Sequence, residues 1–449
     1  MEALRASYFA EICGGELFGD DKELSFVVHD NRKVLDGSIF VAIRGERFDG
    51  HDFLKGAQEA GAAAALVSRR IPEVDIPQIV VQDTVSALGR AAEAYIKTLP
   101  AKRLCITGSV GKTTTKEMCA VVLSESFKTH KTAGNYNNNI GLPLTVFGMD
   151  KSHEAAVLEI GTNHFGEILP LAKIASPDVA LITTIAESHL EAFKTKEGVL
   201  SEKTEIFKGL SEDGIAVLNG DDPLLWGYRS KLNHKCVWFG IENKECDVLG
   251  EIVENNTFAS SFRVKDSDVL FSLPCGGEHN IRDALSAIAV GRVFGMQDAA
   301  IARGLSKFVN TGMRQNIYEY NGVRIIRDCY NANPESMRAA FSLLGGPSGS
   351  GKKICALGDM LELGDNAAML HREVGAAAAK NADMIMATGE FANDYKLGAG
   401  NDKTQVFADK KEMSDALKNI LKPGDTLLVK GSAGTRMWQV LEYLQGEKE

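Results

Sequence analysis

The residues with the clearest chemical potential form a loop at positions 107–115, with the sequence TGSVGKTTT. The loop follows an apolar run, 103–107, that is predicted to be a buried strand, and a helix is expected to start near Lys112. Here backbone N–H groups and the helix dipole can hold phosphates, and glycines let the backbone approach the anion closely. Lys112 would reach the β- and γ-phosphates of a bound nucleotide, and the Thr113 hydroxyl would be a Mg²⁺ ligand. The residues predicted to bind the nucleotide in this loop are Gly108, Ser109, Val110, Gly111, Lys112, Thr113 and Thr114.

The loop departs from the standard phosphate-binding pattern at one position. That pattern has a glycine five positions before Gly111, where this chain has Ile106, so the loop is a shortened variant. The alternative is an ordinary junction between a strand and a helix. Such a junction would leave a lysine and three threonine hydroxyls at a helix start without a ligand, and phosphate binding is therefore the favoured interpretation.

Two other predicted strand ends carry candidate metal ligands. Glu159 lies in an apolar run, 155–160, and His189 follows another, 179–184. Ligands of α/β proteins gather at the carboxyl ends of strands, and a carboxylate oxygen suits Mg²⁺. Taken alone, Glu159 could be a solvated surface group and His189 a structural histidine, but the phosphate loop favours a metal role for Glu159. Lys203 lies in a charged helical segment, whose composition favours a solvated helix face.

Composition excludes several classes of protein. The 449 residues predict about three domains, and 44% apolar with 24% charged residues is the composition of a globular protein. A formal net charge of −10 argues against a dedicated binder of duplex nucleic acid. The eight cysteines include no CxxC pair, which disfavours a zinc ribbon or a disulfide scaffold. The first residues lack a signal-peptide pattern, and no run approaches about 18 apolar residues. We therefore expect a cytoplasmic protein with no nucleic-acid partner and no integral membrane segment.

Apolar β-branched runs alternate with helical segments along the chain, which predicts an α/β protein of three domains. Residues 1–100 are predicted to form a small α/β domain. Residues 101–312 are predicted to form a central domain with a parallel sheet, ending in an alanine-rich helix at 280–293. Residues 313–449 are predicted to form a third α/β unit. The strands expected in the outer domains are 26–28, 39–43, 79–81, 323–327, 353–357, 383–387 and 426–430.

Several longer motifs resemble the Mur ligase family, whose members use ATP to form amide bonds in bacterial cell-wall precursors. In the first domain, DNRKV at 30–34, GSIFVA at 37–42 and FDGHDF at 48–53 look like that family's uridine-nucleotide-binding region. In the central domain, GNYNNNIGLP at 134–143 is similar to a substrate-side loop. In the third domain, DCYNANPESM at 328–337 and LGDMLELG at 357–364 resemble the members that add D-alanyl-D-alanine.

The resemblance implies a three-domain Mur ligase architecture, with a central P-loop ATPase domain and a Rossmann-like C-terminal domain. It implies that the chain, expected to be a monomer, uses ATP to join D-alanyl-D-alanine to UDP-N-acetylmuramoyl-tripeptide through an acyl phosphate. On the nucleotide side it implies further contacts from Asn280, Arg314 and Asp328. The substrate-binding residues that it implies are Asn31, Arg32, Gly50, His51, Asn135, Asn138, Asn139, Asn331 and Asn333.

The resemblance also gives His189 and Lys203 roles that their own context does not. It implies that Thr113, Glu159 and His189 bind Mg²⁺, and that Lys112, Lys203 and His189 take part in catalysis. In the family, a lysine matching Lys203 is carbamylated by CO₂, which converts a cation into an anionic ligand of a second Mg²⁺. That reaction requires a neutral amine, so the surroundings of Lys203 are expected to lower its pKa.

Four positions depart from the family pattern. The family usually has asparagine in place of Thr184 and Asp283, glycine near Ala186, and an acidic residue in place of Trp438, which we expect to pack. The small polar side chains of Thr184 and Asp283 could replace part of the lost hydrogen bonding.

Two other functions stay open at this point. One is a sibling ligase, either another peptide-stem enzyme or a folate polyglutamate ligase; the segment 30–53 disfavours the folate branch, which lacks the uridine-binding domain. The other is a nucleotide-binding switch or scaffold without enzymatic activity. The presence of Glu159, His189 and Lys203 together disfavours it, because nucleotide binding alone needs no second metal site.

Overall fold

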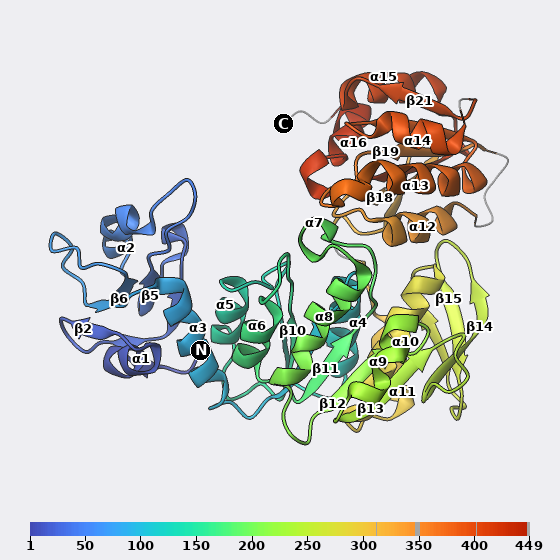
Figure 1. Ribbon diagram of the computed structural model, residues 1–449. Helices are drawn as coiled ribbons and strands as arrows, with labels where there is room; N and C mark the ends of the chain where they lie inside the picture. The colour runs from blue at the N-terminus through green and yellow to red at the C-terminus, as the bar shows by residue number, and fades with distance from the viewer. Residues whose placement is uncertain (311, 346–350, 401, 447–449) are drawn as a thin grey trace.

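In the computed structural model, the chain folds into three α/β domains that follow one another in sequence (Figure 1). The structure describes residues 1–310, 312–345, 351–400 and 402–446, so the end of the predicted third domain, 447–449, lies outside it. In Figure 1 the first domain (blue) lies beside the central domain (green to yellow), and the third domain (orange to red) lies above the central one. The predicted three-domain α/β fold is confirmed.

The first domain is built on a sheet with the strand order β2-β7-β6-β5-β4. Neighbouring strands are parallel except for β2, which runs antiparallel to β7. The apolar runs that predicted strands near 26–28, 39–43 and 79–81 fall in β4, β5 and β7. The elements of this domain are β1 (Leu4–Arg5), α1 (Ala6–Cys13), β2 (Glu16–Phe18), β3 (Glu23–Leu24), β4 (Phe26–Val28), η1 (Asn31–Lys33), β5 (Ser38–Val41), η2 (Gly50–Phe53), α2 (Leu54–Glu59), β6 (Ala64–Val67), β7 (Gln78–Val80) and α3 (Thr84–Ile96).

Helix α3 joins the first domain to the central one. Asp83 caps it by accepting a hydrogen bond from the backbone N–H of Ser86. The helix packs on α1 of its own domain and on α5 (Gly141–Phe147) and α6 (Ile168–Ala175) of the next. The buried Tyr95 hydroxyl donates to the carbonyl of Met149 at 2.8 Å, and its ring stacks on Phe147 with centroids 5.3 Å apart. These contacts bury the boundary between the two domains.

The central domain has a long sheet with the strand order β16-β15-β14-β13-β12-β11-β8-β10-β9. Its strands from β9 to β14 pair in parallel, as the apolar runs predicted, whereas β14, β15 and β16 form an antiparallel ribbon. The elements are β8 (Lys102–Thr107), α4 (Lys112–Leu123), β9 (Thr129–Lys131), α5, β10 (Ala155–Glu159), α6, β11 (Val179–Ile182), α7 (Leu190–Phe193), α8 (Lys196–Thr204), η3 (Glu205–Gly209), β12 (Ile215–Asn219), α9 (Pro223–Tyr228), η4 (Arg229–Lys231), β13 (Lys235–Gly240), β14 (Val248–Asn255), β15 (Ser260–Val264), β16 (Leu270–Leu273), α10 (Glu278–Val293) and α11 (Asp298–Ser306).

The position of β8 in this sheet explains where the site lies. It pairs with β10 on one side and with β11 on the other, so the chain changes direction across the sheet at β8. The carboxyl ends of the three strands are adjacent. Glu159 is the last residue of β10, and the segments that leave β8 and β11 carry the phosphate loop and His189. A reversal of strand order of this kind is where open α/β sheets bind ligands.

Two features of the central domain differ from the prediction. The domain does not end with α10, because α11 packs on α4 and β16 and buries Ile301 and Leu305. The antiparallel ribbon was not predicted. Its strands β15 and β16 alternate buried and more exposed residues, whereas the predicted strands are continuous apolar runs, which are typical of strands covered on both faces.

The third domain has a sheet with the order β17-β18-β22-β19-β20-β21, parallel apart from the antiparallel pair β17–β18. The predicted strands at 323–327, 353–357, 383–387 and 426–430 correspond to β18, β19, β20 and β22. Trp438 packs against the core of this domain, as expected. The elements are β17 (Asn316–Tyr320), β18 (Val323–Asp328), α12 (Pro334–Ser342), η5 (Leu343–Gly345), β19 (Lys353–Leu357), η6 (Gly364–Asn366), α13 (Ala367–Asn381), β20 (Met384–Thr388), α14 (Ala392–Ala399), β21 (Thr404–Phe407), α15 (Lys410–Ile420), β22 (Thr426–Lys430), η7 (Ala433–Thr435) and α16 (Trp438–Gln445).

Candidate active site

The phosphate loop connects the end of β8 to the start of α4 at Lys112, as predicted. Gly108 has φ +147° and Gly111 has φ +85°, conformations that favour glycine. A Cβ at Gly108 would overlap the Thr183 hydroxyl oxygen, so the neighbouring strand end also requires a glycine there. No side chain caps the start of α4. Its first N–H groups are therefore oriented to bind an anion.

Lys112 folds back over this loop. Its ammonium group donates a hydrogen bond to the carbonyl oxygen of Gly108 at 2.8 Å. Burial lowers the pKa of Lys112 to about 8, against the opposing effect of Glu159, and Arg314 adds a smaller lowering effect. A cation held in partly desolvated surroundings interacts strongly with a phosphate that enters beside it.

Thr113 and Glu159 form the most direct candidate for a Mg²⁺ site. The Thr113 hydroxyl donates to one oxygen of Glu159 at 3.0 Å, and the side-chain amide of Asn137 donates to the other at 2.8 Å. Glu159 is buried, and the Lys116 ammonium lies 3.8 Å from its carboxylate. Mg²⁺ prefers oxygen ligands and keeps several waters and substrate phosphates, so it needs few protein groups. The hydroxyl and carboxylate fit that requirement; in the described ranges, no three His, Cys, Asp or Glu side chains form a closed metal cluster.

Lys203 is buried, so the prediction of a solvated helix face is wrong. Its side chain on α8 is 1% exposed, because the charged segment turns this residue toward the domain interior. Burial, reinforced by the positive charge of Lys112, lowers the pKa of Lys203 well below its usual value, while Glu202, Glu167 and Glu159 oppose the shift. The shift raises the fraction of Lys203 that is a neutral amine at a given pH.

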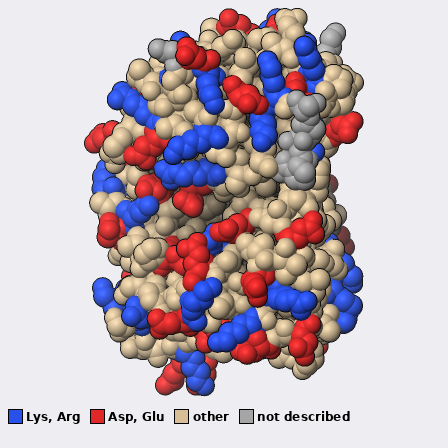
Figure 2. Space-filling view, turned by 90° about the vertical axis from the view of Figure 1, so that its right-hand side faces the viewer, with Lys and Arg blue, Asp and Glu red and all other residues tan. Residues whose placement is uncertain are grey.

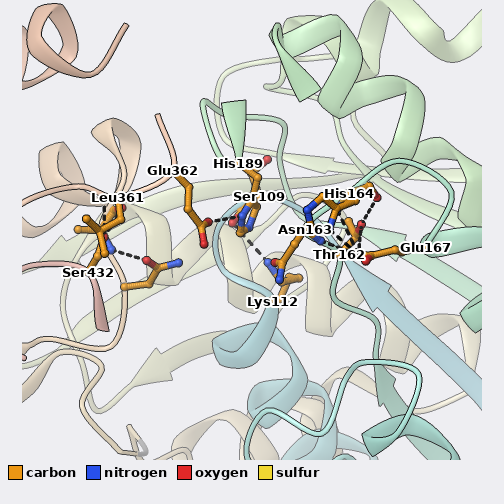
Figure 3. A network of polar contacts seen from close by, with 12 residues as sticks. Ser109, Lys112, Thr162, Asn163, His164, Glu167, His189, Leu361, Glu362 and Ser432 are labelled. Carbon is orange, nitrogen blue, oxygen red and sulfur yellow. Dashed lines mark hydrogen bonds and ion pairs between the residues drawn. The ribbon is translucent and has the colours of Figure 1, made fainter. Parts of the chain in front are cut away.

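The carboxylates around Lys203 are already engaged with backbone groups. Glu202 accepts hydrogen bonds from the N–H groups of Gly166, Glu167 and Ile168 at 2.8–3.0 Å. Glu167 accepts from the N–H groups of Asn163 and His164 (Figure 3). Because both carboxylates accept these backbone hydrogen bonds, the negative charge of neither one interacts with Lys203 alone.

His189 lies between the central and third domains. It precedes α7 with φ +51°, and its Nδ1 is 2.5 Å from Oε2 of Glu362 in the third domain (Figure 3). The atoms satisfy the distance of an ion pair, but their alignment is not that of a hydrogen bond. The sequence analysis does not predict a role for Glu362, although this residue lies in the family motif at 357–364.

A single cavity of about 1380 Å³ brings most of the predicted residues together. Its wall includes the loop residues from Ser109 to Thr114, residues of α3 in the first domain, and residues of the third domain. Figure 2 shows the molecule hollowed between its upper and lower halves, with acidic and basic side chains around the recess. The other predicted residues that line it are Asn135, Asn138, Asn139, Glu159, His189, Asn280, Arg314, Asp328, Asn331 and Asn333.

The third-domain side of the cavity is held by polar contacts. Arg314 lies over the ring of Tyr330, 3.8 Å from its centroid, and Asp328 accepts a hydrogen bond from the Lys430 ammonium at 2.7 Å. Asn333 caps α12 with its side chain. Across the domain boundary, the buried side-chain amide of Asn280 donates to the side chain of Gln315 at 2.8 Å. The sequence analysis does not predict Lys430, because only the pairing of β22 with β18 places it beside Asp328.

Four predicted substrate residues do not line this cavity. Asn31, Arg32, Gly50 and His51 lie in the short helices η1 and η2 of the first domain, both of which contact α2. The side chain of Arg32 pairs with Asp30 at 2.8 Å.

Gly50 and His51 make close contacts within the first domain. A Cβ at Gly50 would lie 2.6 Å from the backbone nitrogen of Ile43. The buried ring of His51 has Nδ1 2.6 Å from Asp49 and accepts a hydrogen bond from the Ser68 N–H at Nε2. The substrate contacts predicted for Gly50 and His51 therefore stay a prediction, and these packing contacts fix the local backbone that carries them.

Two departures from the expected family pattern have local partners. The Thr184 hydroxyl donates a hydrogen bond to Oδ2 of Asp222 at 2.9 Å. This Asp222 oxygen also accepts a hydrogen bond from the N–H of Ile185. Ser109 bonds the backbone of Ala186. Asp222 was missed by the sequence reasoning; its place before a proline, in a turn after a strand, is the signal that could have found it.

Asp283 packs against the phosphate loop. A Cβ added at Gly111 would lie 2.7 Å from the carboxylate of Asp283. Burial raises the pKa of Asp283 to about 8, although the Thr115 hydroxyl, Arg282 and Arg314 act in the opposite direction. The side chain is therefore a neutral carboxylic acid at neutral pH, which resembles an amide more closely than a carboxylate does.

Comparison with known proteins agrees with this geometry. Three family models match the chain: one described as "Mur ligase family, catalytic domain" over residues 23–96, the Mur ligase middle domain over 106–291, and "Mur ligase, glutamate ligase domain" over 313–433. The chain belongs to the Mur ligase family. Each matched range falls within one of the predicted domains.

Individual Mur ligases match along nearly the whole chain. The UDP-N-acetylmuramoyl-tripeptide--D-alanyl-D-alanine ligase of Bacillus subtilis (strain 168) is 39% identical, with 97% of each chain covered. The enzyme of the same name from Escherichia coli (strain K12) is 37% identical, with 99% of each covered. Among solved structures, a MurF from Acinetobacter baumannii has a TM-score of 0.93 at 32% identity, covering 100% of both chains. A MurF from Thermotoga maritima in complex with ADP has a TM-score of 0.83 at 30% identity, covering 94% of this chain and 97% of that one.

In the described part of the chain, the helices are too short or too polar to cross a membrane.

Proposed function

We propose that this chain uses ATP to join D-alanyl-D-alanine to the terminal carboxylate of UDP-N-acetylmuramoyl-tripeptide, giving a UDP-muramoyl-pentapeptide for peptidoglycan synthesis. One observation carries the proposal: the chain matches ligases of that name over 97–99% of its length, and a phosphate loop, a buried carboxylate and residues of all three domains surround one cavity. A carboxylate does not react with an amine directly, since oxide would have to leave, and the phosphate loop supplies the means of activation.

Two displacements complete the reaction. A carboxylate oxygen of the tripeptide attacks the γ-phosphorus of ATP, the bond to the ADP oxygen breaks, and an acyl phosphate forms. The amine nitrogen of D-alanyl-D-alanine then attacks the acyl carbon. The carbon–oxygen bond to phosphate breaks, inorganic phosphate leaves, and the amine loses a proton.

Lys112 and the loop backbone bind the phosphates and reduce the repulsion between ATP and the approaching carboxylate. Thr113 and Glu159 would hold Mg²⁺, with His189 at the same edge of the sheet. When bound, Mg²⁺ would neutralise further charge on the transferred phosphoryl group. The third domain closes the cavity, which excludes water from the acyl phosphate.

In this proposal Lys203, once carbamylated, would be a ligand of a second Mg²⁺. The neutral amine adds to CO₂ and loses a proton, which leaves a carbamate anion in place of a cation. Its burial and lowered pKa favour the neutral amine that this step requires. The charge of a carbamate would also remove the repulsion between Lys203 and Lys112 that now contributes to the shift.

Other residues have binding roles. Asn280, Arg314 and Asp328 bind the nucleoside and phosphates of ATP, and Asn31 and Arg32 bind the uridine nucleotide at the first domain. The substrate side of the cavity is formed by Asn135, Asn138, Asn139, Asn331 and Asn333. We place the protein in the cytoplasm as a monomer; its eight cysteines are unpaired, and one chain supplies all three walls of the cavity.

The test is release of phosphate from ATP in the presence of Mg²⁺ and UDP-N-acetylmuramoyl-tripeptide, with and without D-alanyl-D-alanine, using the wild type and Lys112→Ala. The proposal requires release that depends on both substrates and is lost in the variant. If ATP binds but D-alanyl-D-alanine leaves the rate unchanged, the assignment of this amine is wrong and other amino acids should be tried. If no substrate pair causes release, the chain is not a ligase.

A further inference from the structure

We propose that Glu362 is a positioning residue, which holds the ring of His189 in the orientation that binds Mg²⁺ only while the third domain is docked on the central domain. This inference rests on the proposed metal role of His189. It concerns a residue of the third domain that, unlike the phosphate loop and Glu159, does not line the described cavity.

The contact between the two residues crosses a domain boundary. Oε2 of Glu362 lies 2.5 Å from Nδ1 of His189 (Figure 3). The carbonyl of Glu362 accepts a hydrogen bond from the N–H of Glu191 at 3.2 Å. A Cβ at Gly364, two residues on, would lie 3.4 Å from the Cα of Glu191, so this segment also lies beside Glu191. The side chain and the backbone of Glu362 thus both contact the segment that carries His189.

Both residues are held in an unusual backbone conformation. His189 has φ +51° and Glu362 has φ +65°, values in the left-handed region that residues other than glycine seldom adopt. Facing residues with such backbones indicate that the surroundings fix each side chain in place. The pair itself adds little to stability, because more than half of the Glu362 side chain is exposed to solvent.

The loop that presents Glu362 is tied to the interior of the third domain. The backbone N–H of Leu361 donates to the Ser432 hydroxyl at 3.0 Å, and Ser432 in turn donates to the carbonyl of Ala332. The N–H of Met360 donates to Nε2 of the buried His371. Glu362 therefore moves with the third domain. Ala332 lies between Asn331 and Asn333, so the same movement brings those two residues to the cavity.

The chemistry of histidine explains why a carboxylate at Nδ1 matters for a metal at the other ring nitrogen. A histidine that binds a metal through one nitrogen usually has its other nitrogen paired with a carboxylate or carbonyl, which fixes the tautomer and the ring orientation. With Nδ1 facing Glu362, Nε2 is left for the metal. When the third domain swings away, His189 loses this partner and its ring can rotate, so Mg²⁺ binds less tightly until the domain returns.

The test uses the full-length protein and Mn²⁺ as a probe of the Mg²⁺ site, followed by the EPR signal of free Mn²⁺ without nucleotide. We expect Glu362→Ala to weaken Mn²⁺ binding about tenfold, and Glu362→Gln, which keeps an oxygen at this position, to weaken it less. The matched control is Glu191→Gln, which removes an exposed carboxylate two residues from His189 and is expected to bind Mn²⁺ as the wild type does. The Mg²⁺ concentration needed for half-maximal phosphate release should rise by the same factor in Glu362→Ala, with little change in the rate at saturating Mg²⁺.

The variant His189→Ala separates this inference from the proposed metal role. We expect it to weaken Mn²⁺ binding, and Glu362→Ala to have no further effect in its background. If His189→Ala weakens binding and Glu362→Ala does not, Glu362 is not a positioning residue and the inference is overturned while the metal role stands. If His189→Ala leaves binding unchanged, both fail. Equal weakening by Glu191→Gln would also overturn the inference, because it would show a general effect of local negative charge.

Discussion

The Thr113 hydroxyl donates a hydrogen bond to the Glu159 carboxylate at 3.0 Å, so the first turn of α4 and the end of β10 share one polar contact. The two residues are 46 positions apart in the sequence. Their pairing follows from the parallel register of β10 with β8, in which Glu159 lies beside Ile106, just before the phosphate loop.

Removing this pair is expected to reduce the use of Mg²⁺ rather than the folding of the chain. Glu159→Gln keeps the shape of the side chain and a hydrogen-bond acceptor, but it removes the charge that attracts Mg²⁺. We expect phosphate release to fall at least a hundredfold, with the thermal unfolding midpoint changed by less than about 4 °C. Calorimetry and the phosphate assay measure the two effects. Full activity in Glu159→Gln at low Mg²⁺ would show that the carboxylate is not a ligand.

Lys203 is expected to form a carbamate near neutral pH. Because its pKa is well below that of an ordinary lysine, much more of the amine is uncharged at pH 7 and available to CO₂. Incubation with ¹³C-bicarbonate should give a carbamate carbon signal by NMR that is absent in Lys203→Arg, whose guanidinium stays charged. Lys203→Arg should also lose activity at least a hundredfold. A wild-type signal no stronger than that of Lys203→Arg would exclude the modification.

Asp283 is expected to make ATP binding sensitive to alkaline pH. Its pKa is raised to about 8, so the neutral acid is present below that pH and a carboxylate forms above it, against the phosphate loop. The KM for ATP should therefore rise several-fold between pH 7 and 9, and Asp283→Asn should remove the part of this rise that comes from repulsion. Lys112, whose pKa is also near 8, loses its charge over the same range in both proteins, so the difference between them isolates Asp283.

The same shift bears on stability. In the unfolded chain the Asp283 carboxyl has its ordinary low pKa, whereas in the folded chain the pKa is raised, so the unfolded state releases its proton first as pH rises. Folding is penalised increasingly from about pH 4 up to pH 8. Asp283→Asn should therefore raise the free energy of unfolding at pH 8 but have little effect at pH 4. Urea unfolding at the two pH values tests this sign; equal effects at both would contradict it.

Gly108→Ala is expected to disrupt the loop. The backbone has φ +147° at this position, and a Cβ would overlap the Thr183 hydroxyl oxygen. We expect a loss of about 1–3 kcal/mol in the free energy of unfolding and no measurable ATP binding. Gly295→Ala is a matched control, because Gly295 also has a positive φ, +80°, but has open space where the Cβ would lie. If both variants lose the same stability and still bind ATP, the close contact with Thr183 is unimportant.

How much of the site could be predicted depended on how local each part is. The phosphate loop is contained in nine consecutive residues, so its type, its flanking strand and helix, and its first helical residue followed from the sequence. The burial of Lys203 did not, because the charged residues around it on α8 concealed the direction in which it points. The pairing of Lys430 with Asp328 joins residues 102 positions apart, and only the adjacency of β22 and β18 brings them together.

The family resemblance supplied what local patterns could not. It assigned roles to His189 and Lys203 before their positions were known. It did not indicate that His189 would face Glu362, since the orientation of one domain on another is not encoded in either motif alone. It also suggested substrate contacts for Gly50 and His51, which pack within the first domain and do not line the described cavity, so these contacts stay a prediction.

The buried junction at α3 has a further consequence. Tyr95, Phe147 and the helices around them join the first two domains through their interiors, and residues of α3 reach the cavity wall. The fold therefore fixes the distance from η1 to the phosphate loop, and this distance limits the length of substrate that can span the two. If η1 binds the nucleotide end of the substrate, as proposed above, the terminal carboxylate would reach the γ-phosphate only when the peptide has the right number of residues. The enzyme would then count residues as well as recognise them.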